Sequence, residues 1–167
     1  MQIKLLGYLP TGEVVIIGSA RLEDAQRELG PQFTVDDLRA LARKGWEDVC
    51  EDIVEMPVGW EPPSDRAFRN AWRRPGRTVE GVPHTEEPRI AVEMPVAREI
   101  RRAWIRRKRV TKLTELDRDY LRADEDNDPQ EKARVVAEKR RLRDLPNDPR
   151  IVAARTPAEL IAVTLDP

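Results

Sequence analysis

The sequence predicts an α+β fold that is mainly α-helical, with an N-terminal β-hairpin and short helices followed by a long C-terminal αα-hairpin and short terminal helices. Three observations predict it. β-Branched residues flank a turn near the N-terminus, apolar residues recur at helical spacing from about residue 96, and capping residues followed by proline recur after residue 127. The length of 167 residues suits one domain or two small units. We expect two, over residues 1–63 and 64–167.

The N-terminal hairpin is expected within residues 1–18. Its second half is Glu-Val-Val-Ile-Ile, and the preceding Pro10-Thr11-Gly12 has the composition of a turn. Ser19 is expected to cap a short helix that ends at Gly30-Pro31. The hairpin and this helix open the first unit.

A second short helix is expected between Thr34 and Gly45. Threonine is a good N-cap, two aspartates follow it in the first turn, and basic residues precede the glycine. Residues 46–56 fit helical spacing and strand alternation, so the pattern leaves both open.

The middle of the chain is expected to hold one helix, one loop and one short strand. The helix begins at Ser64 and places Phe68 and Trp72 one turn apart. Glycines and prolines mark residues 73–89 as a loop, and residues 89–94 read as a strand that leads through Pro95 into a helix.

The longest predicted helix covers about residues 96–123. An acidic turn over 124–128 breaks it, and Asp128-Pro129 caps a return helix that ends near Asp144. A long helix, a short turn and a second helix form an αα-hairpin, here over residues 96–145. Asp148-Pro149 and Thr156-Pro157 then each begin a short helix, the second as a capping box with Glu159.

Several classes of chemistry are excluded or disfavoured. One cysteine (Cys50) and one histidine (His84) cannot build a disulfide, a redox pair or a four-ligand zinc site. The sequence lacks a phosphate-binding glycine loop. The acidic turn imitates a calcium loop but has proline where that loop needs glycine. We therefore expect no enzymatic activity, no cofactor and no metal, and no apolar run is long enough to span a membrane.

The charge is balanced in total but unevenly distributed. Residues 1–65 hold 6 basic and 13 acidic side chains, net −7, whereas residues 97–122 hold 10 basic and 4 acidic ones, net +6. The long helix could contact nucleic-acid phosphates, or it could be a solvated face whose partners are the acidic N-terminal half, the acidic turn or another protein. The basic residues in question are Arg101, Arg102, Arg106, Arg107, Lys108, Arg109 and Lys112.

Four tryptophans stand out among only eight aromatic residues. They could anchor the core of a highly charged protein, or they could belong to an interface, where tryptophan and arginine are enriched. The candidate interface residues are therefore Phe68, Trp72, Ile100, Trp104, Arg101, Arg102, Arg106, Arg107 and Arg109.

The C-terminal 100 residues resemble a group of small tailed-bacteriophage proteins. The resemblance rests on residues 65–72, on Met94-Pro95-Val96-Ala97-Arg98-Glu99-Ile100 opening an arginine-rich helix, and on residues 142–149 and 156–160. The chain departs from that pattern at Arg101, where a histidine is expected, and in a longer loop over 73–89. Members are similar to tail-fibre assembly chaperones and other tail-associated proteins.

The resemblance implies a non-enzymatic tail-associated protein, either a structural component of the virion tail or fibre or an assembly factor for tail fibres. The implied partners are other phage tail proteins and, in a homo-oligomer, further copies of this chain. The implied location is the host cytoplasm during assembly. A structural component would also be present in the virion. The alternative function is nucleic-acid binding through the basic helix over 97–122.

Overall fold

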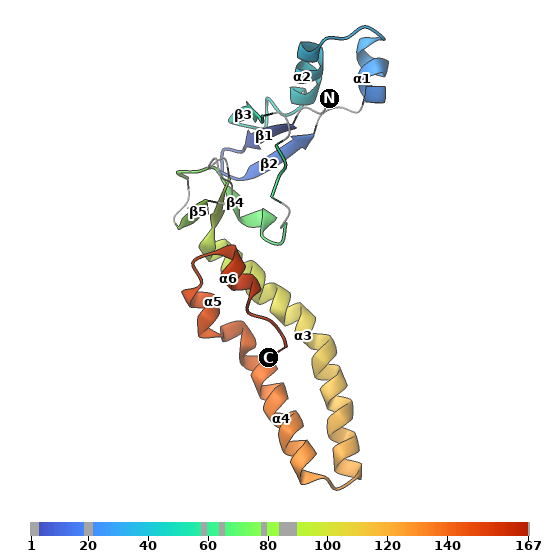
Figure 1. Cartoon of the computed structure of the whole chain (residues 1–167), viewed down its shortest axis with the longest axis vertical. Helices are drawn as coiled ribbons and strands as arrows, with labels where there is room; N and C mark the ends of the chain where they lie inside the picture. The colour runs from blue at the N-terminus through green and yellow to red at the C-terminus, as the bar shows by residue number, and fades with distance from the viewer. Residues whose placement is uncertain are drawn as a thin grey trace. The chain divides into compact units, whose positions relative to one another are not determined.

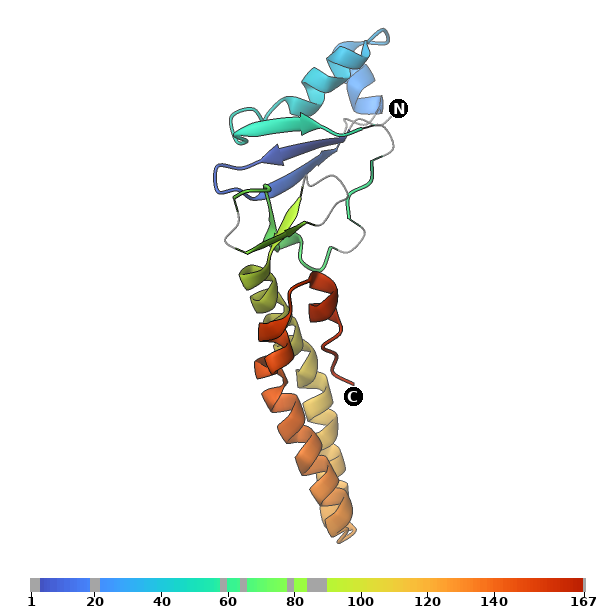
Figure 2. The same cartoon turned by 60° about the vertical axis from the view of Figure 1, so that its left-hand side comes forward.

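The computed structural model describes residues 4–18, 22–57, 60–63, 66–77, 80–83 and 90–166. The chain forms two compact units, Met1–Glu93 and Met94–Pro167, and Figures 1 and 2 show the elements of each. The predicted class, α+β and mainly α-helical, is confirmed. The first unit extends to Glu93 rather than to residue 63, because Arg73 pairs with Ala91 in a small sheet and forms an isolated β-bridge with Glu13 of the N-terminal hairpin.

The N-terminal hairpin is confirmed and belongs to a three-stranded antiparallel sheet. Its strands are β1 (Lys4–Tyr8), β2 (Val14–Gly18) and β3 (Asp52–Glu55), in the order β2-β1-β3. Leu6 of the central strand lies opposite Ile16 on one side and Val54 on the other. For residues 46–56 the sequence left helix and strand open. The structure has turns over residues 44–49 and then the strand β3.

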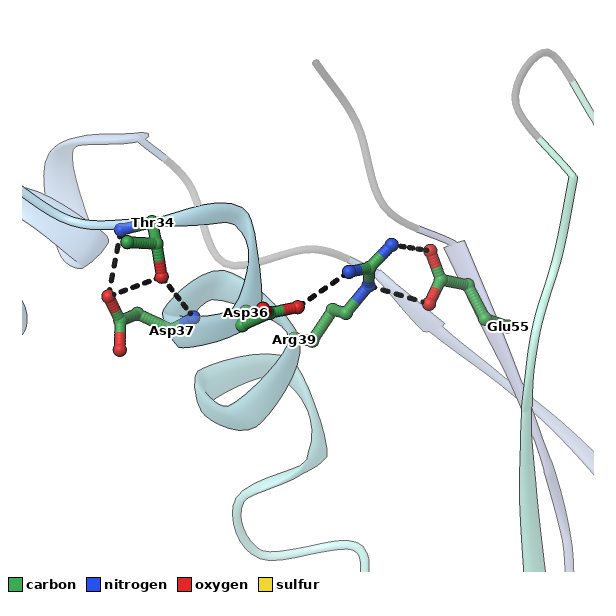
Figure 3. A network of polar contacts seen from close by, with 5 residues as sticks. All are labelled: Thr34, Asp36, Asp37, Arg39 and Glu55. Carbon is green, nitrogen blue, oxygen red and sulfur yellow. Dashed lines mark hydrogen bonds and ion pairs between the residues drawn. The ribbon is translucent and has the colours of Figure 1, made fainter.

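The two short helices of this unit are α1 (Leu22–Leu29) and α2 (Val35–Arg43). Thr34 caps α2 as predicted: its hydroxyl accepts from the Asp37 N–H at 3.2 Å, and the Asp37 carboxylate accepts from the Thr34 N–H at 2.8 Å (Figure 3). The predicted cap Ser19 lies outside the described residues. The core under both helices consists of Leu5, Ile17, Ala25, Leu38 and Ala42.

The helix predicted over 64–72 is wrong for the residues that the structure describes there. The 3₁₀ turn η1 covers only Arg69–Ala71, and Trp72 then enters a strand because its backbone pairs with Val92. The predicted loop over 73–89 is wrong in part, since it contains a strand of the same sheet. That sheet consists of β4 (Trp72–Arg73), β6 (Ala91–Glu93) and β5 (Gly81–Pro83), in that order.

The second unit is helical, and its αα-hairpin is confirmed. The helices are α3 (Met94–Glu125), α4 (Pro129–Asp144), the 3₁₀ turn η2 (Leu145–Asn147), α5 (Pro149–Ala153) and α6 (Pro157–Ile161). The first helix begins two residues earlier and ends two residues later than predicted. Helices α3 and α4 lie side by side in both views (Figures 1 and 2).

The turn of the αα-hairpin joins two capping motifs. Asn127 adopts a left-handed φ of 51° and donates to the Asp124 carbonyl, while the Asp128 N–H donates to the Ala123 carbonyl. This pair of bonds is a Schellman motif, which satisfies carbonyls at the end of α3. The Asp128 carboxylate accepts at 3.0 Å from the N–H groups of Gln130 and Glu131, so it caps α4 as predicted. The acidic turn is thus a helix-capping turn.

Candidate protein-interaction surface

The structure divides the predicted interface residues between the two units. Phe68 and Trp72 are only 2% and 1% exposed and belong to the core of the first unit. Ile100 and Trp104 are half-buried on α3, in the second unit. The two aromatic residues of the first unit thus pack the interior, whereas Ile100 and Trp104 keep part of their surface open.

Three arginines of α3 donate to backbone carbonyls at the ends of other helices: Arg98, Arg109 and Arg101. Arg98 Nη2 donates to Ala154 O at 2.8 Å, where α5 ends. Arg109 Nη1 donates to the carbonyls of Leu142 and Arg143 at 3.3 and 2.6 Å, in the last turn of α4. The last carbonyls of a helix lack partners within it and carry partial negative charge, so a cation is stabilising there.

Arg101 is the most buried of these arginines, with 7% of its surface exposed. Its Nη2 donates to Ile161 O at 3.0 Å and to Val163 O at 2.7 Å, at and just beyond the end of α6. Its guanidinium lies 4.1 Å from the centre of the Trp104 ring. Because burial removes water and no carboxylate of the described residues pairs with it, the pKa of Arg101 is lowered. Arg101 and Trp104 therefore hold the C-terminal segment against α3.

Two further basic residues of α3 are paired within the unit. Arg102 forms an ion pair with Glu99 one turn earlier, and Lys112 forms one with Asp166. Arg106, Arg107 and Lys108 are exposed and make no ion pair with any described residue. Of the seven basic residues singled out on this helix, these three are therefore without an ion pair to any described residue and exposed to a partner.

Sequence reasoning missed an exposed aliphatic surface on the αα-hairpin. Val110 and Leu121 are both 60% exposed, and eleven residues are close to three helical turns, so both lie on one line of α3. Asp117 lies on the same line and forms an ion pair with Lys139 of α4. The line therefore lies on the side of α3 from which Asp117 reaches α4.

The same side of the αα-hairpin carries a second line of exposed residues on α4. Val136 is 46% exposed and lies one turn before Lys139, and the exposed Arg140 and Arg143 continue along that side. We call this surface the hairpin face, defined by Arg106, Val110, Leu121, Val136, Arg140 and Arg143. The eleven-residue spacing of two aliphatic residues in a charged helix is the signal that could have revealed it from the sequence.

The acidic groups of the first unit are largely neutralised within that unit. Glu55 accepts from Arg39 at 2.8 Å, and Figure 3 shows Arg39 between Glu55 and Asp36. Asp52 pairs with Arg74 at 3.1 Å, and Glu51 pairs with Arg77 at 2.7 Å. In the second unit, Asp124 of the acidic turn pairs with Lys132. The acidic turn thus neutralises a lysine of α4.

The first unit also carries an open hollow of about 360 Å³ between α1 and α2. Leu29, Ala40 and Leu41 supply its apolar lining, and Glu28, Asp37, Lys44 and Glu47 border it. Lys44 Nζ lies 3.5 Å from Glu28 Oε2, so these two residues form an ion pair. The other two carboxylates of the border, Asp37 and Glu47, have no ion pair with any described residue. The Asp37 pKa is lowered because its carboxylate accepts from the Thr34 backbone and hydroxyl, so the hollow carries negative charge.

Cys50 is half-buried, and burial raises the pKa of its thiol. Within the described ranges, no three His, Cys, Asp or Glu side chains converge as a metal site would require. The same ranges hold no helix with the length and apolar character needed to cross a bilayer.

Comparisons with known proteins found no match: no family model, no curated protein and no solved structure is similar to this chain.

Proposed function

We propose that the chain is a non-enzymatic bacteriophage tail-associated protein that acts through protein–protein contacts. The observation that carries the proposal is the hairpin face, where three exposed aliphatic side chains lie among arginines that form no ion pair with described residues. Exposed apolar groups gathered on one surface are typical of interaction sites, and arginine is enriched in interfaces. In this proposal the half-buried Ile100 and Trp104 are not part of the contact, and Trp104 packs against Arg101.

The phage assignment rests on the resemblance of the C-terminal residues. Met94-Pro95 begins α3, residues 142–146 end α4 and form the turn after it, and Thr156-Pro157 begins α6. The resembling segments from Met94 onward therefore belong to the same compact unit as the hairpin face, whereas residues 65–72 belong to the first unit. The protein would act in the host cytoplasm during tail assembly and, as a structural component, in the virion.

Mass spectrometry of purified phage particles tests this proposal and separates its two forms. A copy number in fixed proportion to a known tail protein would identify a component of the tail or fibre. Presence in assembly intermediates but not in finished particles would identify an assembly factor. If phage that lack the gene still produce infectious tailed particles, both forms of the proposal are contradicted.

Nucleic-acid binding is the second candidate, favoured by the exposed run Arg106, Arg107 and Lys108. Since Arg101, Arg102, Arg109 and Lys112 are engaged within the unit, this run offers about three phosphate contacts. The logarithm of the DNA association constant should then fall with the logarithm of salt concentration at a slope of about −2.7, from about −0.9 per phosphate. Absence of binding at about 50 mM salt would remove this candidate.

A further inference from the structure

We infer that the hairpin face binds the hollow between α1 and α2 of a second copy of this chain. The inference goes beyond the proposed function by naming a partner. Its test is a self-association measurement, whose failure would leave the association with phage tails untouched.

The hairpin face has an excess of positive charge that the second unit does not neutralise. Asp117 on this face is already paired with Lys139, whereas Arg106, Arg140 and Arg143 are exposed and have no ion pair with any described residue. The face thus combines three unpaired cations with the exposed side chains of Val110, Leu121 and Val136. A surface of this composition fits a partner that is apolar at its centre and acidic at its border.

The hollow between α1 and α2 has that complementary composition. Its apolar lining is aliphatic, and the two carboxylates without an ion pair to described residues, Asp37 and Glu47, are both exposed. Asp48, the next residue along the chain, is also exposed and makes no ion pair with described residues. A volume of about 360 Å³ is at the small end of ligand sites, which span about 300–1,000 Å³, and suits one or two inserted side chains. Arg106 and Val110, one turn apart on α3, are such a pair.

The charge of the chain argues for a second copy as the occupant. Residues 1–93 hold 12 basic and 17 acidic side chains, net −5, and residues 94–167 hold 18 and 14, net +4. The two contact surfaces are different patches of the molecule, so the contact is heterologous. Repeated between copies, a heterologous contact produces a ring or an open chain of subunits.

Sedimentation velocity over a range of protein concentrations tests this inference. The wild-type chain should associate beyond the mass of one chain, and raising the salt from about 50 to about 500 mM should weaken association about tenfold or more, because exposed charges are screened. One variant removes the basic surface (Arg106→Glu, Arg140→Glu, Arg143→Glu), and another removes the acidic border (Glu47→Lys, Asp48→Lys). Each variant alone should remain a monomer.

A mixture of the two variants tests most directly whether the hairpin face of one copy binds the hollow of another. The first variant keeps the acidic hollow and the second keeps the hairpin face, so the mixture should again associate beyond the mass of one chain. Arg118→Glu is the matched control: Arg118 is exposed, has no ion pair with described residues and lies about 100° around α3 from Asp117, so the variant should associate like the wild type.

Three outcomes would overturn the inference. The first is a wild-type mass that stays that of one chain at every concentration. The second is self-association that both variants retain. The third is a mixture of the two variants that stays at the mass of one chain, which would point to a symmetric contact instead. If the arginine variant loses only DNA binding while its self-association is unchanged, the hairpin face binds phosphates and not a second copy.

Discussion

Replacement of Arg101 by methionine tests whether the arginines of α3 hold the second unit together. Methionine keeps the length and much of the volume of the arginine stem but lacks its donors. The change removes the bonds to Ile161 O and Val163 O and the stacking on Trp104. It also removes a buried charge that no described carboxylate neutralises.

The expected loss follows from these opposing effects. Two hydrogen bonds from a charged donor contribute about 2 kcal/mol each, and the contact with the indole ring contributes about 1 kcal/mol. Relief of the desolvation of a guanidinium that is 7% exposed offsets about 3 kcal/mol of this. The free energy of unfolding of the second unit should therefore fall by about 2 kcal/mol.

Urea unfolding followed by circular dichroism measures the loss, and hydrogen exchange of residues 162–166 locates it. Arg106→Met is the matched control, since Arg106 is exposed and has no ion pair with any described residue; its effect should stay within about 0.5 kcal/mol. If Arg101→Met were as mild as this control, or if exchange near the C-terminus were unchanged, the structural role of Arg101 would be refuted.

Three further predictions concern individual positions. Gly7→Ala should destabilise the first unit by about 1–3 kcal/mol in thermal or urea unfolding, because a Cβ there would lie 2.6 Å from Cys50 Sγ; an unchanged midpoint would contradict this packing. Asn127→Ala should cost about 1 kcal/mol and Asn127→Gly should not, since the left-handed φ favours glycine; equal stability of the two variants would argue against the Schellman turn. The Asp148 pKa is lowered from 3.8 by the Arg150 side chain, so its contribution to stability is present above about pH 4 and is lost as pH falls through the folded-state pKa. Asp148→Asn keeps a capping side chain. Its melting temperature should lie below that of the wild type at neutral pH, and the two should converge as the pH falls through the folded-state pKa of Asp148.

Local signals made these capped helices predictable from the sequence. Thr34, Asp128 and Thr156 each cap the helix that the sequence assigns to them, because the cap bond joins residues only two or three positions apart. The N-terminal hairpin was predictable for the same reason, since its strands flank one short turn.

Non-local pairing explains the errors. Phe68 and Trp72 have helical spacing, yet Trp72 pairs with Val92, twenty residues further along the chain, and this pairing overrides the local preference. The hydrogen-bond partners of the α3 arginines were also not predictable, because the carbonyl acceptors of Arg98 and Arg101 are 56 to 62 residues away along the chain. A sequence shows that a helix is basic, but not which of its charges are used inside the fold.

The measurement that tests the central claim most directly is complementation of a phage or prophage from which the gene has been deleted. Deletion should abolish infectious tailed particles, and the wild-type chain and the Arg118→Glu variant should restore them. The folded variant with Arg106, Arg140 and Arg143 all changed to glutamate should not restore them, because the hairpin face is the proposed contact surface. Normal tailed particles without the chain, or full restoration by the triple variant, would contradict the account.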